Sequence, residues 1–260
     1  MDPGAPAVLE LAAIEHAYPG TGDVLAGVDL SIAAGETVAL VGPSGCGKST
    51  LLAVAAGVLA PSGGRVLADG RETTGRPGSV ALMLQRDLLL EWRTVLGNVL
   101  LAPELAGRAR GSRAAALALL ERHGLGQFAE HYPHALSGGM RQRVALVRTL
   151  LAERPVLALD EPLAALDAQA RLDAQAWLEA ALEERGGAVL LVTHDVDEAV
   201  RLADRVVVLS QRPARIVAVV PVPLPRPRDE EAMVSQSFLE VRRAVFLAVR
   251  AEVHRTAGSA

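Results

Sequence analysis

The sequence of 260 residues lacks both a set of cysteines and a long apolar run. Its single cysteine, Cys46, excludes an internal disulfide framework and a cysteine-rich zinc site. A membrane-spanning helix needs roughly 18 or more consecutive apolar residues, and no apolar run here is that long. The first residues also lack the basic start and apolar stretch of a signal peptide, so we expect a soluble intracellular globular protein.

Lysine is almost absent as well. Of the 26 lysine and arginine residues, only Lys48 is a lysine. Arginine is a planar fork, whereas lysine is a compact point charge on a flexible stem, so we infer that position 48 needs the point charge. The net charge of −4 is too acidic to favour nucleic-acid binding through the overall field, and no nucleic-acid partner is predicted.

Apolar patterning predicts the order of the elements. Short β segments with turns occupy the first part of the chain, as far as an apolar run at 80–84. Apolar residues at three- and four-residue spacing then predict helices at 94–105, 114–123 and 140–151. Strands and helices alternate afterwards, with strands at 156–159, 188–192 and 206–209 and helices at 168–184 and 196–202. This alternation predicts an α/β fold with a mostly parallel sheet covered by helices on both faces.

The lone lysine lies in a glycine-rich segment that matches the spacing G-x4-G-K-[S/T]. The segment follows the apolar run 37–41 and precedes a predicted helix at 48–56, which is the context that a phosphate-binding loop requires. Its glycines let backbone N–H groups surround phosphate oxygens, and the helix adds the positive end of its dipole. We expect Lys48 to reach the β- and γ-phosphates and Ser49 to hold Mg²⁺. A glycine-rich turn with a solvated lysine is the alternative. The candidate ATP contacts of the loop are Gly42, Pro43, Ser44, Gly45, Cys46, Gly47, Lys48, Ser49 and Thr50.

Two acids end a second apolar run. Asp160 and Glu161 directly follow the predicted strand 156–159, at the carboxyl end where ligands of open α/β sheets bind. Asp160 would hold Mg²⁺ directly or through water, and Glu161 is the candidate general base for the water that attacks the γ-phosphate. Taken alone, the pair is also compatible with two acids at a solvated strand end. The phosphate loop upstream favours the catalytic interpretation.

Further motifs complete a family pattern. Ser137, Gly138 and Gly139 stand at the start of a predicted helix, within the segment L-S-G-G-M-R-Q, and form a second anion-binding helix end. The remaining motif residues lie at strand ends or in loops and are Tyr18, Gln85, Asp167 and His194. In combination these motifs resemble the ATP-binding cassette (ABC) ATPase family over roughly residues 8–220.

The resemblance implies a role for each of these motif residues. Tyr18 looks like the aromatic that stacks on adenine, although by itself it is a loop aromatic. Gln85 looks like the residue that senses Mg²⁺ and the attacking water and links both to a membrane partner, and His194 looks like the switch histidine at the γ-phosphate. Ser137, Gly138, Gly139 and Asp167 would act in trans on ATP held by a second cassette, so that a homodimer encloses two nucleotides. The implied catalytic residues are Lys48, Gln85, Glu161 and His194, and the implied Mg²⁺ residues are Ser49, Gln85 and Asp160.

The same resemblance implies an architecture. It predicts a P-loop NTPase (RecA-like) core with an N-terminal antiparallel β subdomain and an inserted α-helical subdomain. The ABC ATPase domain would span 1–220, with the core at 1–87 and 155–220 and the helical subdomain at 88–154. Residues 221–260 would form a proline-rich linker and a C-terminal helix at about 230–253, to which we assign no role.

Two segments suggest a branch of the family. Residues 85–99 fit Q-x3-L-L-x-W-x-T-V-x2-N-V and, with residues 210–217, are similar to the nitrate/sulfonate/taurine importers. Glu91 stands where that branch has proline, and Leu163-Ala164-Ala165 replaces Phe-Gly-Ala. The resemblance implies a peripheral subunit on the cytoplasmic face of the cell (inner) membrane. It would hydrolyse ATP to drive uptake of a small anionic solute through separate permease subunits, and an extracytoplasmic solute-binding protein would act with it indirectly.

The alternative is a non-transport ABC ATPase of repair, translation or metallocluster assembly. Only about fifty residues separate Gln85 from Ser137, cysteine pairs are absent and there is one cassette, which favours transport. A small-molecule P-loop kinase would explain neither the segment around Ser137 nor the Asp-Glu pair.

Overall fold

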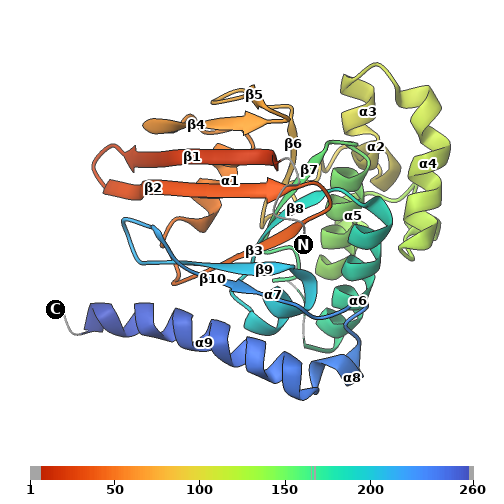
Figure 1. The fold of residues 1–260 in the computed structure, drawn as a ribbon. Coiled ribbons are helices and arrows are strands. Elements are labelled where there is room, and N and C mark those ends of the chain that lie inside the picture. Colours follow the sequence, from red (N-terminus) through yellow and green to blue (C-terminus); the bar gives the residue numbers. More distant parts are fainter. Residues whose placement is uncertain (1–6, 165, 167, 258–260) are drawn as a thin grey trace.

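The computed structural model of this chain describes residues 7–164, 166 and 168–257. Two β-sheets lie against each other, and a group of helices stands to one side of them (Figure 1). The larger sheet has the strand order β10-β9-β3-β8-β7-β6. Its strands are β3 (Thr37–Val41), β6 (Val80–Met83), β7 (Val156–Asp160), β8 (Ala188–Val192), β9 (Arg205–Leu209) and β10 (Ile216–Pro221).

Five of these six strands are parallel, and only β10 pairs antiparallel, with β9. The predicted mostly parallel sheet is therefore confirmed. Strands β3, β7 and β8 are buried at every position, as continuous apolar runs predict for strands covered on both faces.

Alternate residues of β3 face two different cores. Val38 and Leu40 pack in a cluster with the helix α1 (Lys48–Ala55). Ala39 and Val41 face the opposite side and pack in a cluster with α7 (Val196–Leu202). Successive side chains of a strand point to opposite faces, so helices cover both faces of this sheet.

The smaller sheet is antiparallel, with the order β2-β1-β4-β5. Its strands are β1 (Ala7–Tyr18), β2 (Gly22–Ala33), β4 (Gly63–Ala68) and β5 (Arg71–Glu72). Buried residues of β1, β2 and β4 belong to the same cluster as α1 and the larger sheet. This arrangement confirms the expected N-terminal antiparallel β region.

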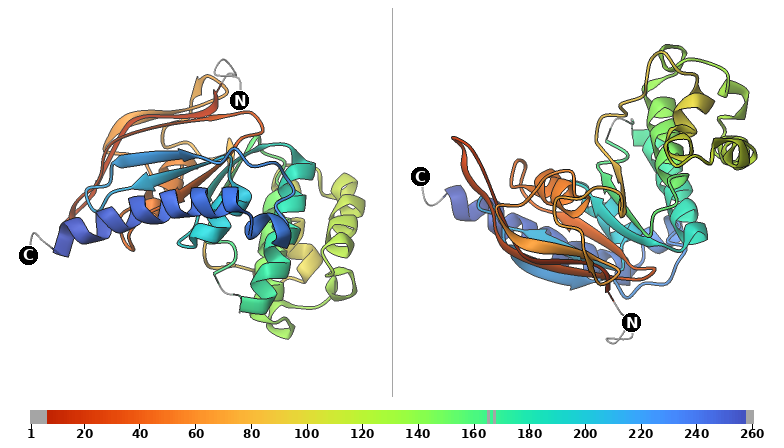
Figure 2. Two further views of the ribbon diagram at one scale, coloured as in Figure 1. Left: turned by 60° about the horizontal axis from the view of Figure 1, so that its bottom comes forward. Right: turned by 90° about the horizontal axis from the view of Figure 1, so that it is seen from above.

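The helices between β6 and β8 are α2 (Val95–Val99), α3 (Leu101–Leu105), α4 (Ala109–Arg122), α5 (Gly138–Leu150) and α6 (Ala168–Arg185), with 3-10 turns at Gly126–Phe128 and Pro133–Ala135. Four of these helices, namely α2, α4, α5 and α6, contribute buried residues to one apolar cluster. Figure 2 shows that α2, α3 and α4 project away from both sheets. The helix predicted at 94–105 is divided in two, because Pro103 has no N–H to donate to the carbonyl of Val99.

The C-terminal region is packed against the larger sheet. The helix predicted at about 230–253 is divided into α8 (Glu230–Met233) and α9 (Gln236–Ala257). Helix α9 runs beside β9 and β10 (Figure 1). Its Phe238 and Val245 are buried in a cluster with residues of β9.

Within the segment predicted as a linker, Arg228 is 1% exposed, and its guanidinium donates to five backbone carbonyls. The boundary that we propose near residue 220 coincides with the end of β10, and the division into domains remains a proposal. Among the described helices, none combines the length and the apolar character that crossing a bilayer requires.

Candidate functional site

The carboxyl ends of four neighbouring parallel strands bring the sequence motifs together. The glycine-rich loop follows β3, Asp160 ends β7, His194 follows β8 and Gln85 follows β6. Parallel strands end at the same edge of a sheet, so segments far apart in the sequence meet there. A cavity of about 300 Å³ at this edge is lined by Ser44, Gly45, Gly47, Lys48, Ser49, Thr50, Gln85, Glu161 and Arg212.

The glycines of the loop are required by its geometry. Gly42 has φ +156°, and a Cβ there would lie 2.8 Å from the carbonyl oxygen of Leu209. Gly47 has φ +128°, and a Cβ there would lie 3.0 Å from Val24. Such backbone angles and close approaches favour glycine over any residue with a Cβ, so the loop keeps its curved path.

Lys48 is the first residue of α1 and is buried beneath the loop. Its Nζ donates to the carbonyl oxygens of Gly42 at 2.9 Å and Pro43 at 3.0 Å. The ammonium group therefore lies inside the curve of the loop, where it can attract an anion. The two carbonyl contacts suit a compact ammonium with rotatable donors, which agrees with the single lysine of the sequence.

Glu161 is the meeting point of the candidate catalytic side chains. Its Oε2 accepts a hydrogen bond from Gln85 Nε2 at 3.0 Å and lies 3.3 Å from His194 Nδ1. The backbone of Glu161 has φ +47°, and its N–H donates to Val192 at 2.9 Å. A non-glycine residue in the left-handed region is strained and is held there by its surroundings. The structure thus brings Gln85, Glu161 and His194 together beside Lys48.

The loop that carries His194 is held on both sides. Thr193 Oγ1 accepts from the N–H of Asp195 at 3.0 Å and donates to Glu198 Oε2 at 2.8 Å. Asp195 caps α7 by accepting from the N–H groups of residues 197 and 198. His194 itself is 57% exposed, so its imidazole is available at the surface of the site. Burial raises the pKa of Glu198 to about 7, and sequence reasoning did not single out this residue.

Asp160 and Ser49 form the candidate cation site. Asp160 is 5% exposed and accepts a hydrogen bond from the Ser49 hydroxyl. The pKa of Asp160 is raised above its ordinary value, mainly by burial and also by the nearby charge of Glu161. The Ser49 hydrogen bond and the charge of Lys48 offset only part of this increase. A carboxylate and a hydroxyl are oxygen ligands of the kind that Mg²⁺ prefers, and a cation would offset the desolvation of the carboxylate. These residues fit Mg²⁺.

Tyr18 lies beside the loop without lining the cavity. It ends β1, is 39% exposed, and its hydroxyl is 3.4 Å from Thr50 Oγ1. The ring of His16 contacts the Tyr18 ring edge-on, with the centroids 4.6 Å apart. His16 is 7% exposed, and the sequence had assigned it no role.

Three residues of the loop do not line the cavity, namely Gly42, Pro43 and Cys46. Cys46 is 2% exposed and borders a neighbouring depression, together with Ser44, Gly45 and Arg212, which also line the main cavity. Burial raises the pKa of the Cys46 thiol, although the nearby charge of Lys48 lowers it.

The Ser-Gly-Gly segment lies outside this cavity. Ser137 caps α5, and its Oγ accepts a hydrogen bond from the N–H of Met140 at 3.3 Å. Ser137 and Gly138 are exposed, and Gly139 has no room for a Cβ because Leu166 Cδ2 would lie 2.7 Å from it. Asp167, the fourth residue expected to act in trans, lies outside the described residues.

Arg212 lines the cavity, although the sequence assigned it no part in the site. It follows β9, the strand beside β3, and so it reaches the same edge of the sheet. The order of strands in the sheet was the missing information, because the sequence alone did not pair β9 with β3.

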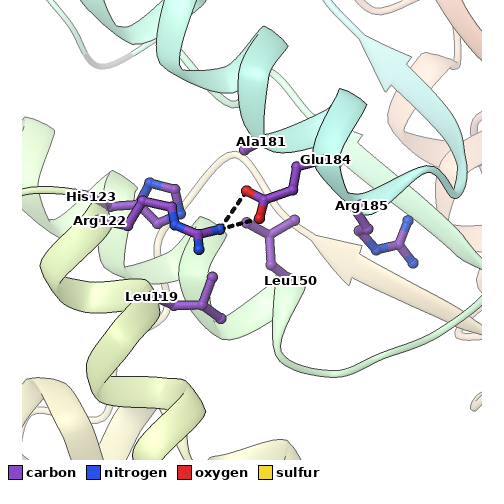
Figure 3. A pocket seen from close by; sticks show the side chains of 7 residues that line it. All are labelled: Leu119, Arg122, His123, Leu150, Ala181, Glu184 and Arg185. Atoms are coloured by element: carbon purple, nitrogen blue, oxygen red, sulfur yellow. Dashed lines mark hydrogen bonds and ion pairs between the residues drawn. The ribbon is translucent and has the colours of Figure 1, made fainter.

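A second cavity, of about 220 Å³, lies where α4, α5 and α6 meet (Figure 3). Arg122 of α4 reaches across it to the carboxylate of Glu184 on α6. No motif residue lines this cavity. The candidate site is therefore the cavity at the sheet edge.

Comparison with known proteins identifies the family. Residues 25–164, which are more than half of the chain, match the family model described as ABC transporter. The uncharacterized ABC transporter ATP-binding protein MJ0412 of Methanocaldococcus jannaschii is 43% identical over 227 residues, or 87% of this chain and 84% of that protein. The aliphatic sulfonates import ATP-binding protein SsuB 1 of Xanthomonas axonopodis pv. citri is 43% identical over 237 residues, which are 90% of this chain and 93% of that protein.

Solved structures agree with these relatives. The dimeric ATP-binding cassette MJ0796 in a post-hydrolysis state, bound to ADP and Pi, is 28% identical and has a TM-score of 0.71. The match covers 84% of this chain and 100% of that chain. A second dimeric structure of MJ0796 has a TM-score of 0.73 at 30% identity. The chain therefore belongs to the ABC transporter family and is one of its ATP-binding, ATP-hydrolysing cassettes.

Proposed function

We propose that this chain is the ATP-hydrolysing subunit of an importer that takes up a small anionic solute of the nitrate, sulfonate or taurine type through a separate permease. The observation that carries the ATPase part is the convergence of Gln85 and His194 on Glu161, since Gln85 and Glu161 line the cavity together with Lys48. The names of several relatives, at 43 to 46% identity, support the importer part, since they are aliphatic sulfonates import ATP-binding proteins.

The residues of the loop would bind the phosphates of ATP. Backbone N–H groups of the glycine-rich loop and of the start of α1 would face the anion, and Lys48 would supply the charge at the β- and γ-phosphates. Tyr18 would stack on adenine beside Thr50. Ser49 and Asp160, with Gln85, would hold Mg²⁺, which when bound neutralises part of the phosphate charge.

Glu161 would act as the general base for the attacking water. Phosphoryl transfer leaves little covalent chemistry to a protein, so these side chains contribute position and charge. Gln85 would orient the Glu161 carboxylate through its hydrogen bond of 3.0 Å to Oε2, and His194, whose Nδ1 lies 3.3 Å from the same oxygen, would contact the γ-phosphate. The strained backbone of Glu161 holds the carboxylate in one direction and so reduces the reorganisation needed at the moment of attack.

A second cassette would complete the site. Ser137 caps α5, and Gly138 and Gly139 are its first residues. Ser137 and Gly138 are exposed, as an anion-binding helix end must be if its ligand is held by another subunit. We assign these residues and Asp167 to contacts in trans within a homodimer. The dimeric state of the MJ0796 structures supports this assembly.

The partner in the membrane would be a permease subunit, with this chain peripheral on the cytoplasmic face and an extracytoplasmic solute-binding protein acting indirectly. The segment after Gln85 presents apolar side chains at the surface, since Trp92 is 75% and Leu88 is 50% exposed. Exposed apolar side chains grouped on one segment are typical of a protein contact.

Purification from the cell membrane tests the importer assignment. We expect the chain to co-purify with a multi-span membrane protein, and the purified complex in vesicles to hydrolyse ATP faster when the solute-binding protein carries its anion. Co-purification with ribosomes, a nucleic-acid repair complex or a metallocluster scaffold, without a membrane protein, would contradict transport and support a non-transport ABC ATPase.

A further inference from the structure

The loop between β9 and β10 is held in one shape. The N–H of Ser210 donates to the carbonyl of Arg215 at 2.9 Å, and the N–H of Arg215 donates to Ser210 Oγ at 2.9 Å. Ala214 pairs with β2, donating to Val24 at 2.8 Å and accepting from Ala26 at 3.1 Å. The two ends of the loop are therefore bonded to each other and Ala214 is bonded to β2, so the position of the loop is defined.

Arg212 lies in this loop and contacts the phosphate loop. Its Nε donates to the carbonyl oxygen of Gly45 at 2.5 Å, and its side chain lines the cavity with Lys48 and Glu161. Within the described part of the chain, Gly45 is the hydrogen-bond partner of Arg212, and this bond uses one of five guanidinium N–H groups. The other N–H groups of this exposed side chain remain available to a ligand at the mouth of the cavity.

Arg212 adds positive charge to the cavity beyond the charge that Lys48 supplies. The ammonium of Lys48 is buried and bonded to two loop carbonyls. The charged side chains that line the cavity are Lys48, Arg212 and Glu161. Without Arg212 the charges of Lys48 and Glu161 would cancel, and the lining would attract a polyphosphate less strongly.

Building on the function proposed above, we propose that Arg212 is a phosphate-binding residue of this cassette. Its guanidinium contacts a phosphate of the nucleotide held by residues 42–50, while the Nε bond keeps Gly45 in place. A guanidinium suits this task because its planar fork matches the oxygens of a phosphate. Residues 210–217, which are similar to the corresponding segment of the nitrate/sulfonate/taurine importers, would thereby contribute a residue to the nucleotide site.

Nucleotide titrations of three variants test the proposal. We expect Arg212→Gln to weaken the binding of Mg-ADP and Mg-ATP by about tenfold or more, because the variant loses a charge-assisted hydrogen bond to a phosphate oxygen. Adenosine, which has no phosphate, should bind with unchanged affinity. Arg212→Lys keeps the charge and should retain part of the affinity. Arg215→Gln is the control, because Arg215 is exposed on the same loop and lines a different depression; it should bind Mg-ADP as the unaltered protein does.

The salt dependence of the titrations and the thermal unfolding of the free variants complete the test. The Mg-ADP affinity of Arg212→Gln should fall less with added salt than that of the unaltered protein, because a phosphate contact has been removed. Binding of Mg-ADP by Arg212→Gln within twofold of the unaltered protein would overturn the proposal. The proposal would also be overturned if Arg212→Gln and Arg212→Lys lost Mg-ADP affinity equally and both unfolded at a lower temperature than the unaltered protein. That result would assign Arg212 a structural role. Failure of the unaltered protein to bind any nucleotide would instead refute the proposed function.

Discussion

Arg141 lies between Asp87 and Glu91, and its guanidinium binds both carboxylates. Its Nε donates to Asp87 Oδ2 at 2.9 Å, and its Nη2 donates to Glu91 Oε1 at 2.8 Å. Burial by itself would raise the pKa of Asp87, but the hydrogen bonds from Arg141 and from the N–H of Leu89, with the Arg141 charge, hold it below its ordinary value. Glu91, the residue that departs from the importer-branch pattern, thus has a defined partner.

This contact joins two motifs. Arg141 is one helical turn after Ser137 on α5, whereas the two acids belong to the segment that follows Gln85. Arg148, two turns farther along α5, donates to the carbonyls of residues 87 and 88 at 2.6 and 2.9 Å. Movement of the helix that carries Ser137 should therefore be transmitted to Gln85.

Arg141→Ala should lower the ATPase rate several-fold and destabilise the protein by about 1–3 kcal/mol, because it leaves Asp87 partly buried without its charged partner. Glu91→Gln should cost less than about 1 kcal/mol, since Glu91 is 51% exposed and exposed ion pairs contribute little. Urea unfolding and steady-state ATP hydrolysis measure both effects. A larger loss of stability in Glu91→Gln than in Arg141→Ala would refute this ranking.

Glu161→Gln should bind ATP with little change and lose most of its turnover, because the amide cannot accept the proton of the attacking water. It should also accumulate an ATP-dependent dimer, visible by size-exclusion chromatography. Glu10→Gln is a suitable control, since Glu10 is exposed on β1. Hydrolysis by Glu161→Gln near the normal rate would remove Glu161 as the base.

Lys48→Ala should abolish tight ATP binding. The variant loses the positive charge under the loop together with both carbonyl contacts, which lie at 2.9 and 3.0 Å. Equilibrium titration with Mg-ATP measures the loss, and circular dichroism checks that the variant is folded. ATP affinity close to that of the unaltered protein would show that the loop binds phosphate without this lysine.

Alkylation of Cys46 should be slow, should block ATP binding and should be prevented by Mg-ATP. The thiol is 2% exposed, and its raised pKa leaves little thiolate at neutral pH, so the reaction should accelerate as the pH rises. Mass spectrometry after treatment with N-ethylmaleimide measures the labelling, and Cys46→Ser is the unlabelled control. Equal labelling with and without Mg-ATP would argue against this prediction.

Glu198 should make the free energy of unfolding depend on pH. Its pKa rises from 4.5 to about 7 in the folded protein. Below about pH 4.5 the carboxyl is protonated in both states, and its contribution to stability is fully present. As the pH rises through 7 the folded protein also loses this proton, and the free energy of unfolding falls by up to about 3 kcal/mol.

Glu198→Gln should therefore be more stable than the unaltered protein at pH 8 and close to it at pH 5. Chemical denaturation at a series of pH values measures the difference, with Glu10→Gln as the exposed control. Identical pH profiles for the unaltered protein and Glu198→Gln would exclude Glu198 as the titrating group.

The sequence by itself determined the phosphate loop, the acid pair and the strands that carry them. These features are local, because a loop that surrounds phosphate needs glycines and a lysine at set spacing between a strand and a helix. The buried strands can likewise be predicted from the sequence, because they are unbroken apolar runs such as 37–41 and 188–192. Local spacing was sufficient for the family resemblance, since its motifs are short and contiguous.

The tertiary structure alone decided which distant residues meet. Arg212 binds Gly45 across 167 positions of sequence, and Glu91 meets Arg141 across 50. The burial of Arg228 among backbone carbonyls is also invisible in a proline-rich segment that reads as a linker. Apolar periodicity indicates which face of an element is buried, but strand order and helix packing determine which charged groups that face meets, and these depend on the whole chain at once.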